Sequence, residues 1–156
     1  LEKIKNFLGP RKKINTEDIL KLTNLSENYS IKELVNSCLA RNKKDTLRII
    51  NENNFSFEDS IIITRSLLNS ANRLLKLIEK KNDITNIEQL ISSHKPPIFW
   101  KDKEVIKNQI KNWKIDSIKN LIYKINEVEL IVKKNSNIAL NIILDFLMQE
   151  CLKPNN

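Results

Sequence analysis

The sequence predicts an all-α protein, a compact bundle of several helices around one long central helix. The chain of 156 residues has one Gly and four Pro, too few for the many turns of an all-β fold. Hydrophobic residues make up 40% and charged residues 29%, a composition typical of a globular domain. Apolar residues recur every three or four positions, and no stretch of useful length alternates as a strand does.

The first part of the chain contains two short helical patterns. Apolar spacing predicts a helix over residues 1–8, which Gly9-Pro10 should end, and Thr16 is placed to cap a second one. The polar stretch 24–28 is the best candidate for a domain boundary. Because the chain begins at Leu1, within a helical pattern, we expect it to be a fragment of a longer protein.

A capping box marks the start of the next helix. In Ser30-Ile31-Lys32-Glu33, the Ser hydroxyl and the Glu carboxylate can each accept a hydrogen bond from a free backbone N–H of the first turn. A tight break at Arg41-Asn42 then leads into another helix, with Leu47 and Ile50 facing inward.

The longest helix is predicted from Ser56 to about Lys80. One apolar stripe follows alternating steps of four and three: Phe57, Ile61, Thr64, Leu68, Ala71, Leu75 and Ile78. A second set widens it: Ile63, Leu67, Leu74 and Leu77. A stripe this wide indicates a central helix that packs on more than one neighbour.

Four further start signals follow. Thr85-Asn86-Ile87-Glu88 is a second capping box, and Pro96-Pro97 predicts an extended entry to the helix after it. That helix should run to about Lys111 or Trp113. Asp116 is expected to cap the next helix, and Ser136 or Asn135 the last one.

Nothing in the sequence favours an enzyme. A phosphate-binding P-loop needs a glycine-rich turn, and a structural zinc site needs about four Cys or His ligands. The chain offers Cys38 and Cys151, both in apolar patterns, and His94, which we expect at the surface or as a cap. We therefore expect no catalytic residue, cofactor or metal.

No apolar run reaches the roughly 18 residues of a membrane helix, and buried free cysteines suit a reducing cytoplasm.

The net charge of +8 raises the question of nucleic acid as a partner. A basic stripe follows the helix that ends near Trp113: Lys103, Lys107, Lys111 and Lys114. This stripe is either the solvated face of an amphipathic helix or a surface that contacts phosphates.

Among the nearby aromatic residues, Phe99 and Trp113 are predicted in the core. Trp100 lies off their stripe and is the candidate for an exposed anchor of a protein interface.

Several segments are similar to one known family. Residues 14–22 resemble the end of an AAA+ lid domain, and residues 29–42 resemble the opening of a helical collar domain. The segments 95–101, 109–113 and 126–133 follow in the matching order. Together they resemble the C-terminal part of the delta subunit of the bacterial DNA polymerase III clamp loader.

This resemblance implies a lid remnant over residues 1–27 and a collar over 28–156. It implies an assembly role without ATP hydrolysis, within a holoenzyme that is a DNA polymerase. The partners would be the other clamp-loader subunits, with the sliding clamp held by an N-terminal module outside this chain and any contact with DNA indirect. The residues alone also leave open a helical DNA-binding module or a free-standing adaptor.

Overall fold

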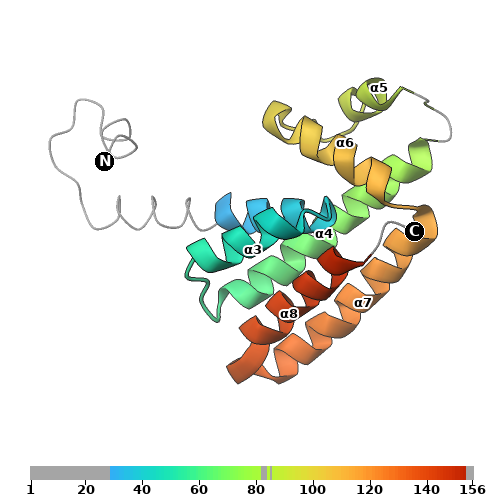
Figure 1. The fold of residues 1–156 in the computed structure, drawn as a ribbon. Helices are drawn as coiled ribbons and strands as arrows, with labels where there is room; N and C mark the ends of the chain where they lie inside the picture. The colour runs from blue at the N-terminus through green and yellow to red at the C-terminus, as the bar shows by residue number, and fades with distance from the viewer. Residues whose placement is uncertain (1–28, 82–83, 85, 154–156) are drawn as a thin grey trace, which may run out of the picture.

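The computed structural model describes residues 29–81, 84 and 86–153, and throughout them the regular structure is helical (Figure 1). This confirms the all-α class. A helix over residues 29–39 is followed by α3 (Lys43–Glu52), α4 (Asp59–Lys80), α5 (Ile87–Ser92), α6 (Lys103–Asn112), α7 (Ile115–Lys134) and α8 (Ala139–Leu152). Two single 3-10 turns, η1 (Trp100–Asp102) and η2 (Ser136–Ile138), precede α6 and α8. The helices and the boundary predicted within residues 1–28 lie outside the described part.

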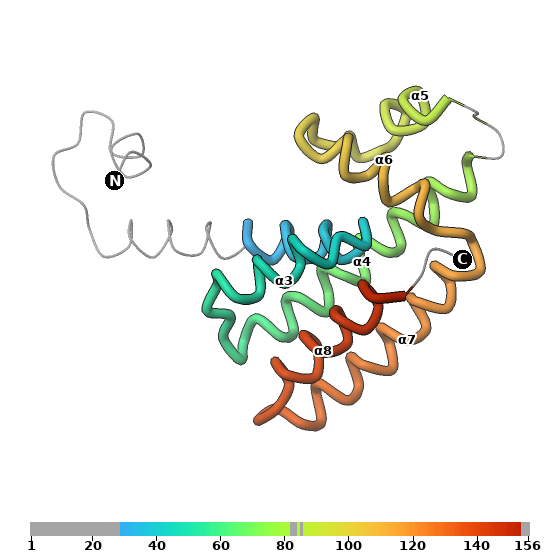
Figure 2. Tube along the Cα trace, in the orientation of Figure 1, coloured from blue at the N-terminus to red at the C-terminus, as the bar shows by residue number. Residues whose placement is uncertain are grey.

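The long helix α4 is central, as predicted. It packs most extensively against α7 and also contacts α8, α6 and α5. In Figure 1, α7 and α8 lie together along α4, the helix over 29–39 and α3 lie on another side, and α5 and α6 occupy one end. The trace in Figure 2 shows that α8 runs back beside α7.

The buried face of α4 includes all of the second predicted set and only part of the first stripe. Leu67 and Leu74 are fully buried, whereas their neighbours Leu68 and Leu75 are half-buried. Phe57 is exposed and precedes the helix, so its assignment to the core is wrong. The apolar surface of α4 is wide enough for either leucine of each pair to face the core. Packing against α7 decides which one is buried.

Asp59 explains why α4 begins three residues later than predicted. Its Oδ2 accepts hydrogen bonds from the backbone N–H and the hydroxyl of Ser56, at 2.6 and 3.0 Å. These bonds hold the chain in a turn before the first helical residue, because a short acidic side chain competes locally for backbone donors.

The predicted cap at Ser30 is wrong, because Ser30 already lies within the helix and its hydroxyl donates to Asn53 Oδ1 at 2.7 Å. Asn86, rather than Thr85, caps α5: its Oδ1 accepts from the backbone N–H of Glu88 at 2.9 Å. The predicted start of this helix is confirmed, but the capping residue is one position later in the chain. Asn caps a helix at least as well as Thr.

Two later caps also differ from the predictions. Asp116 lies in the first turn of α7, and the N-cap position is Lys114. Asn135 precedes η2, and α8 begins only at Ala139. An acidic residue in the first turn still interacts favourably with the positive end of the helix dipole.

One of the two predicted core positions of α3 is exposed. Leu47 of α3 faces solvent, while Thr46 and Ile49 are buried and Ile50 is half-buried. A buried threonine replaces the expected leucine because Thr46 can satisfy its hydroxyl, which donates to the Asn42 carbonyl at 2.8 Å.

The break at Arg41-Asn42 is confirmed and is a Schellman motif. Arg41 adopts a left-handed φ of 56°. Its N–H donates to Cys38 O and the N–H of Asn42 donates to Ser37 O, both at 2.9 Å. These two bonds satisfy carbonyl groups that the end of a helix otherwise leaves free.

Three side chains near the end of α6 complete the same helix end. Gln109 Nε2 donates to Asn36 O at 3.0 Å, and Asn112 Nδ2 donates to Ala40 O at 2.9 Å. The indole N–H of Trp113 donates to Leu39 O at 2.7 Å. The turn after the first described helix is thereby fastened to a helix that lies far along the chain.

Both cysteines are free and buried, as predicted. Burial raises the pKa of the Cys38 thiol, and the nearby Cys151 and Glu150 raise it further. Cys38 Sγ therefore remains a thiol, with Leu147 O 3.5 Å away as its acceptor. Among the described helices, none combines the length and the apolar character needed to cross a bilayer.

Candidate interaction surfaces

Trp100, the predicted interface anchor, lies in η1 directly before α6, and 68% of its surface is exposed. Its ring centroid is 5.8 Å from that of Phe99. Two ammonium groups lie over these rings: Lys101 Nζ is 5.4 Å from the Trp100 centroid, and Lys32 Nζ is 5.7 Å from the Phe99 centroid. We call Tyr29, Phe99 and Trp100 the aromatic patch. The exposure of Trp100 agrees with the expectation, and its role at an interface stays a prediction.

The core position predicted for Phe99 is wrong, since 54% of its surface is exposed. Trp113 is buried as expected, at 6%. Phe99 has extended backbone angles and α6 begins only at Lys103. The helical spacing that aligned Phe99 with Ile106 and Trp113 therefore does not apply to it.

A cavity of about 300 Å³ adjoins the aromatic patch. Tyr29 and Phe99 both line it, together with Ile49 of α3 and Val105 of α6. Such a hollow beside exposed aromatic rings could receive an anchor side chain from a partner, an arrangement found at the centres of protein interfaces.

Three further exposed apolar side chains lie where α7 gives way to α8. Leu130 and Ile131 near the end of α7, and Ile138 in η2, are each about half exposed or more. We call these three residues the α7–η2 patch. The helical spacing of apolar residues after Ser136 predicts Ile138 in the core, and its exposure shows that this prediction is wrong. In Figure 1 this end of the bundle is remote from α5 and α6.

The predicted lysine stripe is not a uniform basic surface. Lys107 is bound between two carboxylates, Glu104 at 2.7 Å and Glu88 at 2.9 Å. The hydrogen bond to Glu104, and then that to Glu88, raise the pKa of Lys107.

Lys111 is exposed on α6, whereas Lys114 lies beyond its end, at the N-cap of α7. Lys103, at the start of α6, is partly buried. Contact of these lysines with phosphates stays a prediction.

A different face carries a more continuous positive charge. Three overlapping hollows of about 440, 740 and 490 Å³ follow one side of α4. The first two share Lys32, Asn69, Ser70 and Arg73, and the last two share Lys76, His94 and Lys95. We call this surface the basic groove, after its cationic residues Lys32, Arg65, Arg73, Lys76, Lys80 and Lys95.

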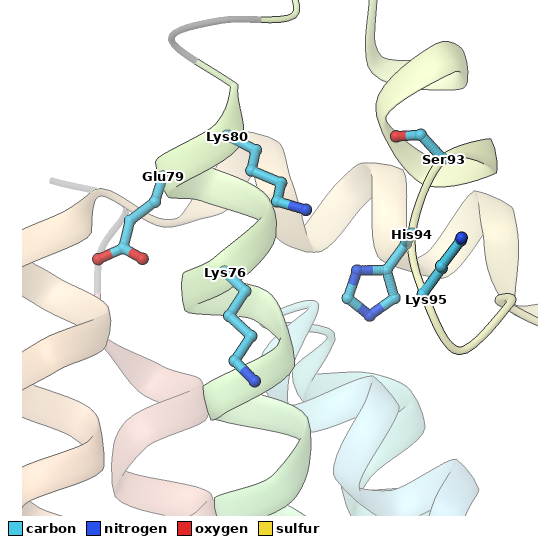
Figure 3. Close-up of a pocket in the computed structure, with 6 residues that line it drawn as sticks. All are labelled: Lys76, Glu79, Lys80, Ser93, His94 and Lys95. Atoms are coloured by element: carbon cyan, nitrogen blue, oxygen red, sulfur yellow. The ribbon is translucent and has the colours of Figure 1, made fainter.

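His94 lies at one end of the basic groove. Only 8% of its surface is exposed, so its expected place at the surface is wrong. Figure 3 shows its imidazole pointing toward α4, with Lys76 and Lys80 reaching from α4 toward the same space and Glu79 turned away. Burial lowers the pKa of His94, and the charge of Arg73, then of Lys80 and Lys76, lowers it further.

We expect the protein to lose stability as the pH falls through the ordinary histidine pKa of 6.5. Protonation of His94 is disfavoured in the folded state, so the unfolded chain binds the proton more readily there. His94 is the only histidine, which makes the effect assignable. The free energy of unfolding, measured with urea at about pH 7.5 and about pH 5.5, should be lower at the acid value.

The His94→Asn variant is the control. Asparagine keeps a polar side chain but does not titrate, so the difference between the two pH values should shrink markedly. An equal acid loss in wild type and variant would assign the effect to carboxylates and contradict the prediction.

Within the described part of the chain, no three His, Cys, Asp or Glu side chains are grouped so that they could hold a metal ion. The surfaces described above consist of aromatic and aliphatic side chains at two places, and of cations in a groove. Comparison with protein-family models, curated proteins and solved structures finds no match.

The basic groove was not predicted from the sequence, although the helical spacing of its residues on α4 is visible there. Arg65, Asn69, Arg73, Lys76 and Lys80 follow helical steps of three and four, opposite in character to the apolar stripe of α4. The remaining cations come from segments far away in sequence, and only the fold brings them to α4.

Proposed function

We propose that this chain is an assembly domain, the helical collar of a clamp-loader delta subunit, which holds its subunit in the ring that loads sliding clamps during DNA replication. The observation that carries the proposal is the presence of two separate apolar surfaces, the aromatic patch and the α7–η2 patch. A subunit inside a ring meets a neighbour on each side, and it therefore needs two contact surfaces.

The chemistry of the two patches suits protein partners. Contiguous exposed apolar side chains on a globular domain mark surfaces for binding, and Trp and Tyr are enriched at the residues that contribute most. A stable interface buries about 1,200–2,000 Å² in total, which requires each patch to be the centre of a larger contact. The expected partners are the other clamp-loader subunits.

The order of elements also supports the proposal. Residues 29–42, which resemble the opening of a helical collar domain, form a helix and a tight turn, and α3 and the long α4 follow. The resembling segments 109–113 and 126–133 lie at the end of α6 and on α7. In this role the chain acts in the bacterial cytoplasm, a reducing compartment compatible with two free thiols.

Co-elution with the remaining clamp-loader subunits on size-exclusion chromatography tests this function. The wild-type chain should join the complex, and Leu130→Glu or Trp100→Glu should weaken its incorporation about tenfold or more, because a charge would be buried in an apolar contact. Leu47→Glu is the matched control, since Leu47 is an exposed apolar residue of α3 outside both patches. It should assemble normally.

Two results would contradict the proposal. One is a folded wild-type chain that fails to co-elute with the other subunits. The other is an equal loss of assembly in Leu47→Glu, which would show that any added negative charge disturbs the domain and that the patches have no special role.

A further inference from the structure

The basic groove is long enough to follow a linear ligand. Its three hollows overlap along α4 from Arg65 to Lys80, a rise of about 22 Å. The residues that line it include six cations and two anions, Glu79 and Asp102. Asp102 pairs with Lys32 at 2.6 Å, and the Glu79 carboxylate is turned away from His94, Lys76 and Lys80 (Figure 3).

Four of the other cations have no ion-pair partner within the described part of the chain: Arg65, Lys76, Lys80 and Lys95. Arg73 forms no ion pair there either, but the charge of Asp102 acts on it, and burial lowers its pKa. This contrasts with Lys107 on α6, which two carboxylates already hold. Uncompensated positive charge in a concave surface concentrates the field and attracts an anionic ligand.

Neutral donors lie between these cations. Ser66, Asn69, Ser70 and Asn72 line the groove on the same helix. Arginine and lysine side chains, together with hydroxyl and amide groups, make most of the contacts that proteins form with the phosphates of nucleic acids. Side chains of this kind, repeated along one groove, fit a ligand whose phosphates also repeat.

An aromatic ring lies at the edge of the groove. Phe99 lines the middle hollow and is more than half exposed. A charged groove that follows the backbone, next to an aromatic ring on which a base can stack, is how proteins hold single strands without reading their sequence. A duplex keeps its bases paired and offers no free base to such a ring.

We propose that the basic groove binds the phosphate backbone of a single-stranded nucleic acid, with Phe99 stacking on one of its bases. This site shares Phe99 with the aromatic patch, its cations along α4 lie outside both assembly patches, and it adds a second activity to the domain. Because the groove contacts phosphates and stacks on any base, binding is independent of sequence and weakens as salt rises.

Fluorescence anisotropy of the whole chain with a labelled strand of about 20 thymidines tests the site. The groove variant Arg65→Gln/Lys76→Gln/Lys80→Gln should bind at least about tenfold more weakly and reduce the slope of log affinity against log salt by about 2, as expected for three lost contacts. All three residues are exposed, so the variant should fold, and circular dichroism verifies this.

The matched control removes three charges elsewhere. Lys103→Gln/Lys111→Gln/Lys114→Gln changes the net charge equally but lies on α6 and at the start of α7, and it should bind within about twofold of wild type. Phe99→Ala should weaken binding about tenfold and leave the salt slope unchanged. A strand of uridines in place of thymidines distinguishes RNA from DNA, and tighter binding of either supports the site.

Three outcomes would overturn the proposal: no binding by the wild type at about 50 mM salt, equal losses in the groove and control variants, or tighter binding of a duplex than of the single strand. The measurement uses this chain alone, so failure to assemble with clamp-loader subunits would leave its result unaffected.

Discussion

Replacing Trp113 with Ala should destabilise the protein by about 3–5 kcal/mol, the usual cost of removing a buried aromatic side chain. Trp113 is almost fully buried, and its indole N–H satisfies the carbonyl of Leu39. The Arg41 guanidinium carbon also lies 4.4 Å from its ring centroid. The substitution therefore removes core packing, a buried hydrogen bond and a cation–π contact together. Urea unfolding followed by circular dichroism measures the loss.

Two control variants separate these contributions. Trp113→Phe keeps an aromatic ring but removes the N–H donor, so it should lose about 1–3 kcal/mol from the unsatisfied Leu39 carbonyl. Trp100→Ala removes the other tryptophan, which is exposed, and should change stability by less than about 0.5 kcal/mol. Equal losses in the two tryptophan-to-alanine variants would contradict the placement of Trp113 in the core.

Leu67→Ala should cost about 2–5 kcal/mol, whereas the same change at Leu68 should cost about 1 kcal/mol. Leu67 is fully buried and Leu68 is half-buried. Removing the Leu67 side chain leaves a cavity in the core beneath α4, and the close packing around it cannot collapse completely.

This pair of variants tests the orientation of α4 directly, since the two leucines are adjacent and chemically identical. The sequence placed both leucines in one wide apolar stripe, and the structure buries Leu67 more deeply than Leu68. The same comparison can be repeated with Leu74 and Leu75. If Leu68→Ala were the more damaging change, the central helix would be rotated relative to the structure described above.

Local chemistry made part of the fold predictable. The break at Arg41-Asn42, the end of α4 at Lys80 and the burial of Cys38 and Cys151 were all foreseen, because each depends on nearby residues or on apolar spacing. The few glycines and prolines, and helical periodicity over most of the chain, were sufficient for the fold class.

The parts that were missed depend on distant residues. The centre of the α4 stripe is chosen by α7, and periodicity alone could not choose between Leu67 and Leu68. The burial of His94 follows from its packing beside α4, although its neighbours in sequence are polar. The basic groove needs Lys32 and Lys95 beside α4, an arrangement that exists only in three dimensions.

The bonds from α6 to the first described helix have a consequence for synthesis on the ribosome. The donors Gln109, Asn112 and Trp113 are 72 to 74 residues later in the chain than the carbonyl groups they meet. At translation rates of about 5–20 residues per second, the ribosome makes these donors about 4–15 s after the carbonyl groups. Until then this helix end lacks its three side-chain donors, so it should become permanently ordered only after α6 and Trp113 have been made.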